Sequence, residues 1–212
     1  MPQIIEKTVY AFNELSDRAK ERARDWWRGC EASDFDPDCV LEDAQRVADL
    51  LGITLAQKPV KLMGGGTRYE PTIYYSGFSS QGDGACYEGS YRYQKGATKA
   101  IRGYAPEDKE LHRIADELQR IQKGYFYGLT ARMKHDGHYD HAYSMSVDVD
   151  HDRNPYCVDA NLERELAEPL RDFANWIYRQ LEREYEYRMS AENVDESIEI
   201  NGYQFDENGQ IH

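Results

Sequence analysis

The sequence predicts an α+β fold, a single domain in which helices pack on an antiparallel sheet. Apolar residues recur at helical spacing toward both ends of the chain, whereas the middle alternates apolar and polar residues with a period of two. The expected strands follow one another through short turns, as antiparallel neighbours do. The 212 residues suffice for one sizeable core, and no internal repeat, low-complexity run or linker divides them.

The N-terminal part, residues 13–52, is expected to form two helices. Ser16 can cap the first helix, and Asp36 followed by Pro37 can begin the second, which Gly52 ends. Each helix carries one apolar stripe. The stripes are Leu15, Ala19, Ala23, Trp26 and Trp27 in the first helix, and Val40, Ala44, Val47, Ala48 and Leu51 in the second.

The middle part, residues 53–150, is expected to contain the sheet. A strand near 53–62 stops at the glycines 64–66, and two helices are predicted, near 96–103 and from Pro106 to Gly124. Apolar and polar residues alternate through 143–149, which is typical of a half-buried strand. The predicted sheet contains four segments: 71–78, 85–93, 125–134 and 139–149.

The C-terminal part, residues 157–212, is expected to hold a long helix and a small tail. The helix covers 159–188 and packs on one face of the sheet, and Pro169 should bend it or mark a restart. Ser190 can cap a last short helix, and Asn208-Gly209 can turn a small terminal hairpin.

The net charge of −13 is concentrated in three blocks that contain no lysine or arginine. Blocks of one sign can build a directional field, and alternate carboxylates on a strand stand roughly 6.6 to 6.8 Å apart, close to the phosphate spacing of an extended nucleic-acid strand. One hypothesis is therefore that two of the blocks imitate phosphates toward a basic partner; the other is a solvated acidic face. The candidate contact residues are Glu31, Asp34, Asp36, Asp38, Asp148, Asp150 and Asp152.

The stretch "SGFSSQGDGACYEG", residues 76–89, resembles a functional glycine loop only superficially. It lacks the lysine and hydroxyl residue of a phosphate-binding loop, and Asp83 would repel a phosphate. Cys86 could serve as a nucleophile if His135, His138 or His141 supplied a base across the sheet, but a free cysteine is commonly a small buried residue. The sequence favours a structural turn and no enzymatic activity.

Two segments contain residue types that bind metals, one rich in histidine and the other rich in aspartate. In "HDGHYDH", residues 135–141, neither possible hairpin register gathers three histidines, although a loop with an odd number of residues fits the apolar pattern better. In "DVDHDRNPYCVD", residues 148–159, a calcium-loop spacing is broken by Arg153 and Pro155. No metal and no cofactor are therefore expected.

Tyrosine is abundant, with 17 residues, many of them on the predicted sheet. Because tyrosine joins apolar area to a polar tip, it suits protein interfaces, and Tyr87 and Tyr91 are candidate partner contacts. Aromatic platforms also bind single-stranded nucleic acid, but they need a basic groove beside them. The neighbouring blocks are acidic, so no direct nucleic-acid binding is expected.

Four stretches carry a family resemblance: "IYYSGFSSQGDGACYEGSYRY", "YAPEDKELHRIADELQ", "YDHAYSMSVDV" and "EYEYRMSAENVDESIEINGYQFDENG". They resemble an uncharacterised family of acidic proteins encoded by bacteriophages and prophages, sometimes labelled antitoxin-like. The resemblance covers most of the chain and transfers no catalytic motif. It implies an inhibitor of host defence, such as an anti-CRISPR protein or a DNA mimic.

These observations together predict a phage-type inhibitor that docks on a host protein or ribonucleoprotein defence complex. One form of this hypothesis has it occupy the nucleic-acid-binding surface of that complex as an acidic mimic. The alternatives are an antitoxin-like neutraliser of a toxin and a small Cys/His or metal-dependent hydrolase. The opening residues lack the apolar stretch of a signal peptide, no apolar run is long enough for a membrane helix, and the four cysteines form no CxxC pair. A cytoplasmic location in the bacterial host is expected, with the oligomeric state left open.

Overall fold

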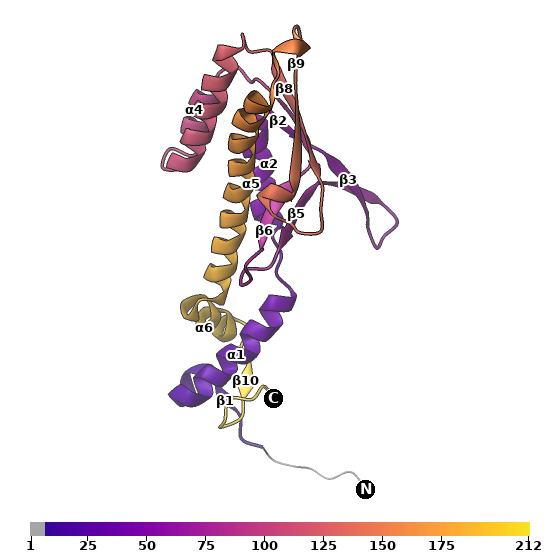
Figure 1. Cartoon of the computed structure of the whole chain (residues 1–212). Helices are drawn as coiled ribbons and strands as arrows, with labels where there is room; N and C mark the ends of the chain where they lie inside the picture. Colours follow the sequence, from indigo (N-terminus) through magenta and orange to yellow (C-terminus); the bar gives the residue numbers. More distant parts are fainter. Residues whose placement is uncertain (1–6) are drawn as a thin grey trace. The chain divides into compact units, whose positions relative to one another are not determined.

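The computed structural model describes residues 7–212, and the fold combines helices with antiparallel sheets, which confirms the predicted class (Figure 1). The contacts group the chain into two compact units. The larger unit is Asp38–Glu182, and the smaller one combines the described residues up to Pro37 with Arg183–His212. The second predicted helix, which follows Pro37, lies in the larger unit together with the sheet.

A four-stranded antiparallel sheet forms the centre of the larger unit, in the order β2 (Ile53–Leu55), β7 (Gly89–Arg92), β8 (Leu129–His135) and β9 (Met145–His151). Alternate side chains on these strands are buried, so one face belongs to the core and the other meets solvent. The register places Met133 opposite Val147 and Ala131 opposite Val149. The predicted odd loop between β8 and β9 is therefore confirmed.

Four shorter strands form two separate ladders beside this sheet. β3 (Gln57–Lys61) pairs with β4 (Thr67–Pro71), and β5 (Ile73–Ser76) pairs with β6 (Gly84–Tyr87). The predicted single sheet is thus wrong in two places: segment 71–78 pairs outside it, and segment 85–93 divides at Glu88 between two sheets.

The division has a clear physical cause, a ring of three backbone hydrogen bonds. Ala56 N donates to Glu88 O (2.8 Å), Thr72 N to Ala56 O (2.7 Å), and Glu88 N to Thr72 O (3.0 Å). Each of these residues lies between two strands, so each strand pair can turn into the next while the backbone groups at the bend stay bonded.

Two further predicted strands are shorter than expected. Residues 125–128 form a turn, in which Phe126 and Tyr127 have φ of 51° and 60°. Residues 142–144 form a 3-10 turn, η2 (Ala142–Ser144), so β9 begins only at Met145.

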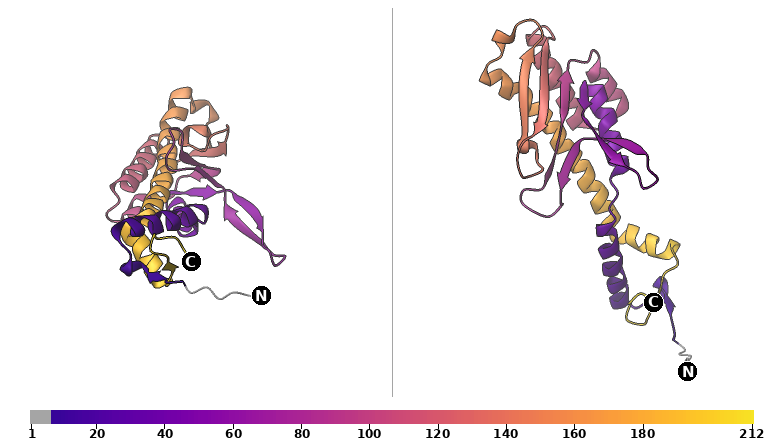
Figure 2. Two further views of the ribbon diagram at one scale, coloured as in Figure 1. Left: turned by 90° about the horizontal axis from the view of Figure 1, so that it is seen from below. Right: turned by 90° about the vertical axis from the view of Figure 1, so that its right-hand side faces the viewer.

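Helices cover the core face of the sheet: α2 (Asp38–Leu51), α3 (Ala97–Tyr104), α4 (Lys109–Gly124) and the part of α5 (Ala160–Met189) that belongs to this unit. Figures 1 and 2 show α4 and α5 on one side of β8 and β9. Trp176 Nε1 donates to Asp108 (2.8 Å), and Arg113 pairs with Asp172 (2.9 Å), so α4 is held along α5. Pro169 lies inside α5 without ending it.

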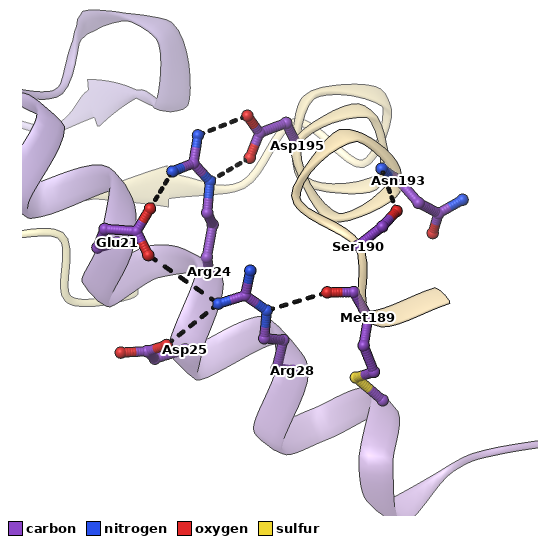
Figure 3. Close-up of polar contacts among 8 residues, drawn as sticks. All are labelled: Glu21, Arg24, Asp25, Arg28, Met189, Ser190, Asn193 and Asp195. Carbon is purple, nitrogen blue, oxygen red and sulfur yellow. Dashed lines mark hydrogen bonds and ion pairs between the residues drawn. The ribbon is translucent and has the colours of Figure 1, made fainter. Parts of the chain in front are cut away.

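The smaller unit contains β1 (Tyr10–Ala11), α1 (Asp17–Ser33), α6 (Ala191–Ile200) and β10 (Gln204–Phe205), and β1 pairs with β10. Arg24 holds Asp195 with two hydrogen bonds of 2.6 and 2.7 Å and also bonds Glu21 (Figure 3). Ser16 and Ser190 cap α1 and α6, as predicted. The core residues are Phe12, Leu15, Ala19, Ala23, Val194, Ile198 and Phe205.

Candidate functional site

Three side chains with ligand chemistry meet where the β5–β6 ladder contacts the loop after β8. Cys86 comes from β6, His135 ends β8, and Asp140 lies in the loop, and their ligand atoms lie within 4.8 Å of one another. Cys86 is buried, whereas the side chains of His135 and Asp140 are 18% and 31% exposed. From the sequence, Cys86 was paired with His135 as a possible nucleophile and base, but Asp140 was not assigned to the same site.

The neighbours of His135 fix its imidazole from several sides. Nε2 lies 3.4 Å from Asp140 Oδ1 and 3.2 Å from the carbonyl oxygen of Tyr139. The ring of Tyr74 packs on the imidazole, with 4.6 Å between centroids. The backbone N of His135 donates to Glu88 Oε1 (3.3 Å). The imidazole is therefore positioned before any ligand arrives.

The environment of Cys86 disfavours a nucleophilic role. Burial raises the pKa of its thiol to about 12, and the carboxylates of Asp140 and Glu88 add to that increase. Because the reactive form of cysteine is the thiolate, a buried and protonated thiol is a poor nucleophile.

The glycine-rich loop is a structural turn. Asp83 Oδ2 accepts hydrogen bonds from the backbone N of Ser79 (2.9 Å) and Ser80 (2.6 Å), so its carboxylate already serves the loop itself. Gly84 is needed for a close approach, since a Cβ there would come within 2.7 Å of the Cβ of His141. The absence of a side chain at Gly84 therefore lets the Asp140 loop approach β6.

Tyr87 and Tyr91 cannot contact a partner, which corrects the prediction for both residues. Their side chains are buried, and the Tyr87 hydroxyl donates to the carbonyl oxygen of Leu170 (3.0 Å) while its ring meets Phe173 edge-on. Sequence composition could not distinguish these tyrosines from exposed ones, because it does not show that α5 packs against Tyr87.

The acidic block of β9 lies on the solvent face of the sheet, where basic residues interrupt it. Asp148 stands opposite Arg132 in the register, and Asp152 lies 3.7 Å from Arg92. Asp150 is exposed opposite Thr130. This face therefore mixes both signs of charge and does not form a continuous negative strip.

The first acidic block is divided between the two units. Glu31, Asp34 and Asp36 belong to the smaller unit, where Glu31 pairs with Arg188 (3.2 Å). Asp38 belongs to the larger unit and lies 3.4 Å from Arg68. Two acids of this block are thus partly neutralised by the chain's own arginines.

A projecting hairpin was missed as a functional element. β3 and β4 extend away from the rest of their unit (Figures 1 and 2), and no side chain from residue 57 to 69 is buried. Met63 at its tip is fully exposed, Leu62 is 49% exposed, and Tyr69 is 66% exposed. The sequence signal was available: "LMGGG" places two large apolar residues directly before a glycine turn.

The family model of a domain of unknown function, DUF8835, matches residues 37–191, which include both the hairpin and the Cys86 cluster. No curated protein and no solved structure matches the chain. None of the helices described in residues 7–212 is long and apolar enough to cross a membrane.

Proposed function

The chain belongs to the DUF8835 family, and we propose that it acts by binding another protein, with the β3–β4 hairpin as the contact element. The observation that carries this proposal is the exposure of Leu62, Met63 and Tyr69 on a ribbon that buries none of its own side chains. An isolated two-stranded hairpin is marginally stable, and the exposed surface of its apolar tip residues lies outside any core. A contact with a partner accounts for them, since interfaces are enriched in tyrosine and methionine.

The charges on the hairpin define the partner's chemistry. Lys58 and Lys61 are exposed, while Arg68 is paired with Glu70 (2.6 Å). The hairpin is thus locally basic in a chain of net charge −13. The partner that fits is a folded protein with an apolar pocket for the tip and carboxylates around that pocket.

The resemblance to phage-encoded proteins favours a host defence protein or ribonucleoprotein complex as this partner, so the proposed role is that of an inhibitor. Neutralisation of a toxin would use the same type of contact. Phosphate mimicry by Asp148, Asp150 and Asp152 has weaker support, because Arg92 and Arg132 lie beside these acids.

The test uses the full chain with a photo-crosslinking amino acid at position 63, and a matched chain carrying it at position 156. Tyr156 is as exposed as Met63 but lies outside the hairpin. We expect one bacterial protein to crosslink from position 63 only. Binding of that purified protein should then weaken by about tenfold or more in the double variant Leu62→Ser, Met63→Ser, as is usual for central contact residues.

Tyr156→Ser should bind as the wild type does. The proposal is wrong if the double variant keeps full affinity for the purified partner, or if crosslinking does not distinguish positions 63 and 156. If the double variant still binds the partner but charge reversal of Asp148 and Asp150 abolishes binding, the acidic face of the sheet is the contact surface instead.

A further inference from the structure

We propose that Cys86, His135 and Asp140 bind a zinc ion through the thiolate sulfur, an imidazole nitrogen and a carboxylate oxygen. This site is independent of the hairpin and of the proposed binding function. It lies wholly within the larger unit.

The distances suit a tetrahedral ion. Zinc bonds of 2.0 to 2.3 Å at tetrahedral angles separate neighbouring ligand atoms by about 3.4 Å. The separation between His135 Nε2 and Asp140 Oδ1 is already 3.4 Å, and all three ligand atoms lie within 4.8 Å of one another. Side-chain adjustments of about 1 Å would complete the coordination.

The donor set selects the metal. Calcium and magnesium prefer oxygen ligands throughout, whereas a combination of sulfur, nitrogen and oxygen suits zinc. Three protein ligands leave a fourth position for water, and the side chains of His135 and Asp140 are partly exposed to solvent. On binding, the thiol proton passes to solvent and the zinc–sulfur bond forms.

The surroundings restrict the movement of His135 and bring the Asp140 loop close to β6. Tyr74 packs on the imidazole, and Glu88 accepts a hydrogen bond from the His135 backbone. Gly84 lets the loop approach β6, which brings Asp140 toward Cys86. A bound ion would join β6, the end of β8 and the loop before η2, so it would fasten residues 136–144 to the sheet.

The experiment is a zinc titration of the full chain, freed of any affinity tag and stripped with a chelator, in competition with a chromophoric chelator. We expect one zinc ion per chain and a higher melting temperature with zinc. Cobalt-loaded protein should show a thiolate-to-cobalt charge-transfer band. Cys86→Ser and Asp140→Asn should each weaken zinc binding by more than about tenfold, a loss that even an outer partner can cause.

Two variants serve as matched controls. Cys157→Ser removes another cysteine, and His138→Gln changes a histidine of the same loop that lies outside the cluster; both should keep wild-type affinity. If Cys86→Ser does not fold, the zinc affinity of Asp140→Asn tests the proposal alone, because a change at a partly exposed side chain should leave the fold intact. The proposal is overturned if Asp140→Asn binds zinc normally, if the cobalt protein lacks the thiolate band, or if excess magnesium displaces the zinc.

Discussion

At the scale of single residues, the hydroxyl of Tyr91 provides a test of the core. Burial raises the pKa of Tyr91 from 10.0 to about 12, and a hydrogen bond with Gln122 only partly offsets this effect. The buried neutral hydroxyl therefore stabilises the fold below pH 10, and this contribution is lost as the pH rises from 10 toward 12.

We predict that Tyr91→Phe makes the free energy of unfolding less dependent on pH in that window, by up to about 1.4 kcal/mol per pH unit. Urea unfolding of both proteins below and above pH 10 measures the difference. Tyr156→Phe is the control, because that side chain is fully exposed and its hydroxyl meets water in both states. If the free energy of unfolding depends on pH in the same way in the wild type and in Tyr91→Phe, burial does not raise the pKa of Tyr91.

The hydrogen bonds of a side chain could be predicted where its bonding partner is close in the sequence. Ser16 and Ser190 cap their helices through backbone groups three residues away. The burial of Tyr87 and the meeting of Cys86 with Asp140 depend on contacts across more than fifty residues, and a single sequence carries no signal for them.

At the scale of elements, helices were predicted within a few residues, because each one shows its own apolar period: 159–188 was expected and α5 is Ala160–Met189. Strands were not, because the ring of bonds among Ala56, Thr72 and Glu88 decides where one ladder ends and the next begins. The periodicity of 85–93 does not reveal that the backbone of Glu88 bonds Ala56 and Thr72.

We predict that Gly89→Ala destabilises this junction. A Cβ at Gly89 would come within 2.3 Å of the carbonyl oxygen of Thr54 and 3.1 Å of the Cα of Leu55, so the β2–β7 pairing must shift. The expected loss of unfolding free energy is about 1–3 kcal/mol, measured by urea denaturation. Gly103→Ala in α3 is the control, and we expect the opposite effect. A Cβ at this position meets nothing within 4 Å, so the substitution should stabilise the helix by up to about 1 kcal/mol. A neutral Gly89→Ala would show that the strands adjust freely.

At the scale of the whole molecule, two independent boundaries nearly coincide. The family match covers residues 37–191, and the contacts group Asp38–Glu182 as one unit. The sequence predicted a single domain because no linker is visible: α5 runs without interruption past Glu182. The contacts group the residues on the two sides of Glu182 separately, although the helix is continuous there.

We predict that residues 37–191 fold on their own. This fragment keeps the four-stranded sheet, the three-bond ring and the helices that cover the core face, and it ends just after α5. Its circular dichroism should show a cooperative thermal transition. Its near-ultraviolet signal should report ordered packing of Phe173 against Tyr87 and Trp176 in the core. A matched fragment that begins at residue 53 omits α2, whose Ala44, Val47, Ala48 and Leu51 are buried, and it should lack that transition. If the fragment 37–191 melts without cooperativity while the full chain does not, the two units depend on each other and the single domain predicted from the sequence is the better description.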